Sequence, residues 1–261
     1  MCRAAALTPV ATVAPKTTTS LPRTPTAPAP RDLLSRRPEV SRSASTRPSR
    51  TGAGGGARPL IVFDWDDTLF PTSALLNLRQ DLGSPAPRPG TKLYEALQIQ
   101  AEEVLATLKV AKALGSVMII TAAEEGWVQQ TCAKFLPAVL PAMQGPRAWV
   151  KVISARSTYE PLGYAGSFAW KAKAFTAAVR QHFAAAPLSG VRHVVSIGDA
   201  DYERQALKGC TGAAGYLGKS LRLLRSPSLA RITEEAALIR GALEHLCTHD
   251  GHLDLQMEPK W

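Results

Sequence analysis

The stretch "RPLIVFDWDDTLFPTS", residues 58–73, decides the fold expected for this chain. It places four apolar residues, at 60–63, directly before three aspartates. A short, continuous apolar run of this kind predicts a strand that is buried on both faces. Asp64, Asp66 and Asp67 would then lie just past the carboxyl end of that strand, where open α/β sheets bind their ligands.

Similar apolar runs recur along the chain, separated by stretches with helical periodicity. Helices are predicted over 91–114 and 168–185, with Phe168 and Phe175 on the apolar face of the second. Short buried strands that alternate with helices predict a parallel sheet with helices on both faces, a doubly wound (Rossmann-like) α/β domain. The strands after the first are predicted at 116–120, 150–154, 193–197 and, less regularly, 221–224.

The positive charge of the chain is concentrated at its N-terminus. The 261 residues carry a net charge of +10. Residues 1–58 contain ten basic and two acidic side chains, which leaves 21 basic and 19 acidic ones, a net of +2, for the remainder. We therefore expect no nucleic-acid partner for the folded domain. No apolar run approaches the roughly 18–20 residues of a membrane span, so no membrane partner is expected either.

The composition divides the chain into three parts. Residues 1–58 are rich in Pro, Ala, Ser, Thr and Arg and lack aromatic residues, which predicts a disordered basic extension. The same composition is typical of a plastid or mitochondrial transit peptide; the alternative is a plain tail on a cytoplasmic protein. Residues 59–248 form the predicted domain, and 249–261 a polar C-terminal tail.

Histidines and a cysteine gather where the domain meets this tail. The stretch "EHLCTHDGH" contains His245, Cys247, His249 and His252, which could bind a transition metal. A polar tail that follows a terminal helix is the preferred interpretation.

The crowded aspartates need a partner that offsets their charge. Carboxylates this close repel each other unless a cation lies between them. Mg²⁺ is bound by hard oxygen ligands, commonly one or two carboxylates together with substrate phosphate oxygens. One carboxylate could then act as a nucleophile and another as an acid and base. The alternative is an acidic turn that caps a helix at "DDTL", residues 66–69.

The stretch "IVFDWDDTL" resembles the first motif of the haloacid dehalogenase (HAD) superfamily of aspartate-nucleophile phosphatases. The resemblance implies that Asp64 is the nucleophile that becomes an aspartyl-phosphate and that Asp66 is the general acid and base. An aspartate at the second position is typical of the phosphatases rather than the dehalogenases. The main-chain carbonyl of Asp66 is an expected metal ligand. Asp67 is left as a turn or capping residue.

Two further stretches resemble the second and third motifs of the superfamily. "SVMIIT" ends in Thr121, whose hydroxyl would bind the transferring phosphoryl group. The residues themselves also allow a capping box, in which Thr121 and Glu124 open a helix. "FAWKAKAF" offers Lys171 and Lys173, either of which could neutralise the carboxylates and the phosphate. Lys171 is preferred because it lies nearer the start of the helix.

The stretch "VVSIGDADYE" resembles the fourth motif. It implies that Asp199 is a direct Mg²⁺ ligand and that Glu203 holds a metal-bound water or the lysine. Asp201 is the alternative to Glu203, which is preferred by its spacing from Asp199. Gly198 permits a tight turn at the end of the strand.

These motifs together predict a Mg²⁺-dependent phosphomonoester hydrolase whose substrate is a phosphorylated small molecule or protein. The 56 residues between Asp64 and Thr121, and the 49 between Thr121 and Lys171, are too few for a large cap domain. The second hypothesis is a non-catalytic HAD-like module that binds a phosphorylated ligand or a protein. The joint presence of Asp64, Asp66, Lys171 and Asp199 argues against it.

Overall fold

A computed structural model describes residues 57–258, apart from 81, 84, 187–189 and 214. All six strands are parallel and follow the order β3-β2-β1-β4-β5-β6. The predicted extension, except for its last two residues, lies outside the described part, so its disorder and its targeting role stay predictions. The strands are β1 (Leu60–Phe63), β2 (Ser116–Thr121), β3 (Lys151–Ser154), β4 (Arg192–Gly198), β5 (Tyr216–Arg222) and β6 (Leu253–Gln256).

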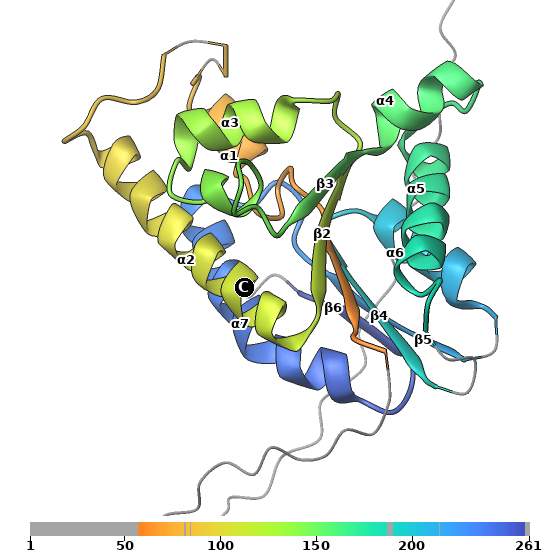
Figure 1. Ribbon diagram of the computed structural model, residues 1–261. Coiled ribbons are helices and arrows are strands. Elements are labelled where there is room, and N and C mark those ends of the chain that lie inside the picture. The colour runs from red at the N-terminus through yellow and green to blue at the C-terminus, as the bar shows by residue number, and fades with distance from the viewer. Residues whose placement is uncertain (1–56, 81, 84, 187–189, 214, 259–261) are drawn as a thin grey trace, which may run out of the picture. The chain divides into compact units, whose positions relative to one another are not determined.

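Helices cover both faces of this sheet, which confirms the predicted doubly wound α/β architecture (Figure 1). Helices α2, α3 and α7 pack on one face, and α4, α5 and α6 on the other. No helix in the described ranges is both long and apolar enough to cross a membrane. The helices are α1 (Thr72–Asn77), α2 (Lys92–Leu114), α3 (Trp127–Phe135), α4 (Ala155–Tyr159), α5 (Ser167–His182), α6 (Asp201–Thr211) and α7 (Leu229–Thr248).

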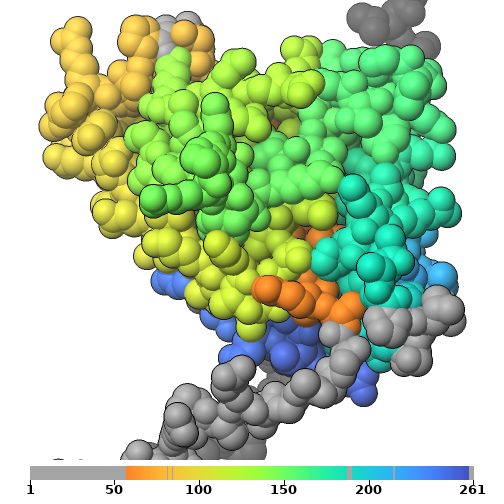
Figure 2. Space-filling view, in the orientation of Figure 1, coloured from red at the N-terminus to blue at the C-terminus, as the bar shows by residue number. Residues whose placement is uncertain are grey.

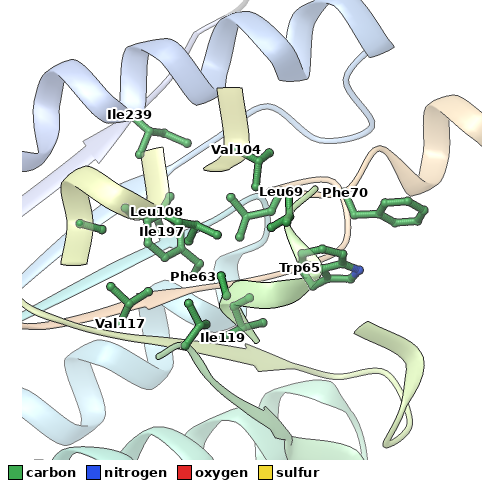
Figure 3. Close-up of a cluster of buried hydrophobic side chains, with 14 of the residues drawn as sticks. Phe63, Trp65, Leu69, Phe70, Val104, Leu108, Val117, Ile119, Ile197 and Ile239 are labelled. Carbon is green, nitrogen blue, oxygen red and sulfur yellow. The ribbon is translucent and has the colours of Figure 1, made fainter. Parts of the chain in front are cut away.

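Strand β1 lies at the centre of the sheet and contributes to both cores. Successive side chains of a strand point to opposite faces. Ile61 and Phe63 therefore enter the core under α2 and α7, and Leu60 and Val62 enter the core under α5 and α6. Figure 3 shows Phe63 within the first of these cores. Burial on both faces explains why the sequence here is apolar at every position.

The structure corrects two predictions near the C-terminus. Strand β5 begins at Tyr216, five residues before the predicted start, because the polar residues Lys219 and Ser220 are buried within it. The predicted polar tail contributes β6, which pairs with β5. Asp254 of β6 is bound by two side chains of α6: it is 2.8 Å from Lys208 Nζ and also contacts Arg204. A strand with polar side chains resembles a tail in the sequence, and only its pairing identifies it.

One further prediction is changed, and the alternative of a metal site near the C-terminus finds no support. Phe168 was expected on the apolar face of α5, but 51% of its surface is exposed because it lies in the first turn of the helix. The residues of "EHLCTHDGH" do not form a metal-binding group within the described chain. Cys247 is buried in α7, and His252 Nδ1 accepts a hydrogen bond of 3.1 Å from the Gly218 amide.

A buried acid in α7 gives the first prediction. Glu235 is fully buried, and burial raises its pKa to about 7 against the opposing charge of Arg231. In the unfolded chain the pKa of a glutamate is near 4.5. Between pH 4.5 and about 7 the native state therefore binds more protons than the unfolded state, and the free energy of unfolding falls as pH rises through this range. Glu235→Gln should therefore raise the free energy of unfolding at pH 8 by about 1–2 kcal/mol and change it little at pH 4.

Urea unfolding at both pH values measures this difference. Glu234→Gln is the matched control, because Glu234 contacts the same Arg231 at 3.1 Å but is exposed. It should change stability by less than about 0.5 kcal/mol at either pH. A Glu235→Gln variant that is less stable than the wild type at pH 8 would contradict the prediction.

Candidate functional site

The order of the strands reverses between β1 and β4, and the candidate site lies at their carboxyl ends. The two strands pair in register, with Phe63 beside Ile197. Asp64 follows β1 directly, and Asp199 follows β4 after Gly198. Sheet pairing thus brings together two carboxylates from distant parts of the sequence, at the position where doubly wound folds bind ligands.

Lys171 of α5 reaches into this site. Its side chain is fully buried, its Nζ lies 2.7 Å from Asp64 Oδ1, and it forms a second ion pair with Glu203. Burial acts to lower the pKa of Lys171, but the charges of Asp64 and Glu203 outweigh it and raise that pKa. Lys173, the alternative, is exposed and lies over the Tyr164 ring at 4.7 Å. Of the two lysines, Lys171 is the one that contacts the carboxylates.

Glu203 enters the site from the first turn of α6. It is buried, and its Oε2 has no hydrogen-bond partner among the described residues. Burial raises its pKa, and Lys171 opposes that rise. Gly198 makes room for it, since a Cβ there would lie 2.7 Å from Glu203 Cγ. Asp201 instead contacts Arg222 at the surface, so the structure brings Glu203 and not Asp201 to the lysine.

Three carboxylates at the site could hold a metal ion. Asp64, Asp199 and Glu203 each offer an oxygen, and these oxygens lie within 4.8 Å of one another. Burial raises the pKa of Asp199 to about 7, and the charges of Asp64 and Asp67 add to the rise. Such a group of hard oxygen donors suits a divalent cation, which would offset their mutual repulsion.

Asp66 lies beside this cluster and is held by contacts that the sequence did not predict. Its carboxylate accepts hydrogen bonds from Thr72 Oγ1 and, at 3.0 Å, from Trp127 Nε1. Burial raises the pKa of Asp66, although both hydrogen bonds act to lower it. The aromatic Tyr202, also not predicted, lies with its ring 5.0 Å from Lys171 Nζ. Trp127 lies outside the motifs, and Tyr202 lies within the fourth one at a position to which no role was assigned, so only their place in the fold identifies them.

Thr121 ends β2 at the same edge of the sheet, two residues past the pairing of Ile119 with Phe63. Its Oγ1 accepts a hydrogen bond of 3.0 Å from the Ala123 amide. The capping box with Glu124 is wrong, because α3 begins only at Trp127, after Gly126 in the left-handed conformation. The role of Thr121 in phosphate binding stays a prediction.

Asp67 adopts a positive φ of 53° and organises the turn between β1 and α1. Its carboxylate accepts hydrogen bonds from the Ser73 amide, at 2.8 Å, and from the Ser73 hydroxyl. These contacts agree with its interpretation as a turn and capping residue. The three aspartates of the opening stretch therefore have different surroundings.

Comparison of the chain with models of protein families, with curated proteins and with solved structures finds no match.

The buried ion pairs give the second prediction. Lys171→Met removes the cation and leaves Asp64 and Glu203 buried without it. In buffer that contains EDTA, this change should lower the free energy of unfolding by about 3–5 kcal/mol, as measured by urea denaturation. Lys173→Met, on the exposed face of the same helix, should lower it by less than about 0.5 kcal/mol. Equal effects of the two changes would contradict the arrangement described here.

Proposed function

We propose that the chain is a Mg²⁺-dependent phosphomonoester hydrolase of the HAD superfamily that acts through an aspartyl-phosphate. The observation that carries this proposal is the contact of buried Lys171 with Asp64 and Glu203, beside Asp199, at the carboxyl ends of β1 and β4. A nucleophilic carboxylate, a fixed cation and further metal-binding oxygens are the groups that phosphoryl transfer requires. The substrate is a phosphorylated small molecule or a phosphorylated protein.

Asp64 would supply the nucleophile. One of its carboxylate oxygens attacks phosphorus in line with the ester oxygen, the new O–P bond forms, and the bond to the leaving alkoxide breaks. Lys171, at 2.7 Å, fixes the orientation of the carboxylate and offsets the charge of the incoming phosphate. Thr121 would donate its hydroxyl to a phosphoryl oxygen.

Asp66 would move the protons. Its raised pKa favours the protonated form that a general acid needs, so it can protonate the leaving alkoxide. It would then accept a proton from the water that attacks phosphorus and releases Asp64. The hydrogen bonds from Thr72 and Trp127 hold its carboxylate in place for both steps.

The acidic residues fit a bound Mg²⁺. Asp64, Asp199 and the Asp66 carbonyl would bind it, and Glu203 would hold Lys171 or a metal-bound water. The Glu203 oxygen without a partner among the described residues supports such an additional contact. When bound, the cation supplies positive charge against the phosphate and the crowded carboxylates.

An aryl phosphate tests this proposal. The full chain should hydrolyse p-nitrophenyl phosphate with Mg²⁺, and EDTA should abolish the reaction. Asp64→Asn should lower kcat by at least about 10³-fold, because the amide is a poor nucleophile. The control is Asp201→Asn, whose carboxylate is bound to Arg222 and whose loss should change kcat less than about threefold.

Turnover that survives EDTA or Asp64→Asn would overturn this mechanism. No turnover of any compound in a broad phosphoester panel would favour the non-catalytic binding module instead.

The metal ligands give a separate prediction. Asp199→Asn should raise the Mg²⁺ concentration that gives half-maximal activity by about 10–100-fold, because a neutral amide binds the cation more weakly. Titration of activity with Mg²⁺ measures this shift. Asp250→Asn, an exposed acid in the α7–β6 turn, is the control and should leave the titration unchanged. An unaltered titration for Asp199→Asn would exclude Asp199 as a ligand.

A further inference from the structure

A cavity of about 390 Å³ lies along the outer edge of β3. Residues Lys151–Ser154, the whole of β3, line it. Within the described ranges, β3 pairs with β2 alone, so its other edge has no neighbouring strand. Hydrogen-bonding groups of a parallel strand point alternately to its two sides. Backbone N–H and C=O groups of β3 therefore face this cavity.

Helices wall the cavity on both sides of the sheet. Val128 and Gln129 of α3 line one wall, and Ala174 and Ala177 of α5 line the other. Val128 belongs to the core on one face of the sheet and Ala174 to the core on the opposite face. The cavity therefore straddles the sheet edge and forms a slot between α3 and α5, with residues 157–159 of α4 also in its lining. Figures 1 and 2 view the molecule from this side.

The slot shares Thr121 with the residues predicted for the candidate site. Its lining includes Lys151, which pairs with Met118, and Thr121, which pairs with Ser154. Three residue steps of a strand span about 10 Å, so the slot takes about four residues of an added strand. The Thr121 end of the slot lies at the carboxyl ends of the strands, as do Asp64 and Asp199.

The two ends of the slot carry side chains of opposite charge. Glu124 and Glu125 line it near Thr121, and both are exposed. Arg156 lies 3.3 Å from Glu124 and offsets part of this negative charge. Lys151, also exposed, lies at the opposite end. A bound chain with a basic residue near Thr121 and an acidic residue near Lys151 would complement these charges.

We infer that the edge of β3 binds an extended polypeptide as an added strand and that this polypeptide carries the phosphorylated residue to the candidate site. The inference rests on the proposed function and specifies its substrate class as a phosphorylated polypeptide. Main-chain hydrogen bonds to β3 supply the affinity, as in other cases of strand addition. The small alanines of α5 leave space for the added backbone.

Synthetic peptides test this inference. The first probe is acetyl-Arg-pSer-Val-Thr-Val-Glu-amide, which places its phosphate near Thr121 when it lies antiparallel to β3. The second, acetyl-Glu-Val-Thr-Val-pSer-Arg-amide, does so when it lies parallel. One of the two should be hydrolysed with a kcat/KM at least about tenfold above that of p-nitrophenyl phosphate and of the same peptide with Arg and Glu exchanged.

A variant that narrows the slot identifies where the peptide binds. Ala177→Met places a longer side chain at an exposed position of the α5 wall. It should raise KM for the preferred peptide and lower the ratio of peptide to aryl-phosphate kcat/KM about tenfold. Ala113→Met, the same change at an exposed position of α2, should leave that ratio unchanged.

Hydrogen exchange of the full chain tests binding without turnover. In EDTA, the preferred peptide should slow exchange of β3 amides at least about tenfold. Aryl-phosphate hydrolysis without peptide preference or β3 protection would overturn the inference and leave the proposed function intact. Absence of all hydrolysis would contradict the proposed function, while β3 protection would still support strand addition. The β3 amides that point toward β2 are protected by that pairing in any case. Protection, in the chain alone, of the β3 amides that point away from β2 would assign the slot to the chain itself or to a second copy and overturn the inference.

Discussion

The ion pairs of Lys171 are the interaction on which the candidate site depends. A fully buried ammonium is costly unless its charge and its hydrogen bonds are satisfied, and Asp64 and Glu203 satisfy both. The same contacts join three elements, the end of β1, α5 and the first turn of α6. The nucleophile candidate therefore directly follows the central strand, whose residues lie in both cores.

The parallel sheet determines where chemistry can occur. All carboxyl ends of the strands lie at one edge, so residues that follow β1, β2 and β4 meet there although they are distant in sequence. The acids of the site have different surroundings: Lys171 lies beside Asp64, Trp127 and Thr72 donate hydrogen bonds to Asp66, and other carboxylates lie near Asp199. Neighbouring carboxylates can take separate roles when their surroundings differ in this way. The slot at β3 includes Thr121 in its lining and runs along the side of the sheet where β3 has no further strand among the described residues.

Much of the fold could be predicted from the sequence because β1 is apolar throughout and β2 and β4 each contain an apolar run, a pattern that burial on both faces of a sheet produces. Strand β6 could not, since an edge strand with exposed side chains has no distinctive pattern and is held by pairing with β5 and by Asp254. The early start of β5 was missed because Lys219 is buried against His193, a contact from a neighbouring strand. Phe168 was wrongly predicted to be buried, because helical periodicity indicates which face of a helix is apolar but not how far along the helix that face is covered by the core.

The sequence by itself determined which residue types follow which strands: Asp64 and Asp66 after the first, Thr121 at the end of the second, and Asp199 and Glu203 after the fourth. The position of each residue relative to its strand was sufficient for this, because the carboxyl ends of all strands in a parallel sheet lie on the same side. Only the tertiary structure shows that Lys171 and not Lys173 contacts Asp64, and that Glu203 and not Asp201 contacts this lysine, since neighbours on one helix differ in the direction of their side chains. It also supplied Trp127, Tyr202 and the slot beside β3, which arise from the packing of elements that the sequence does not place side by side.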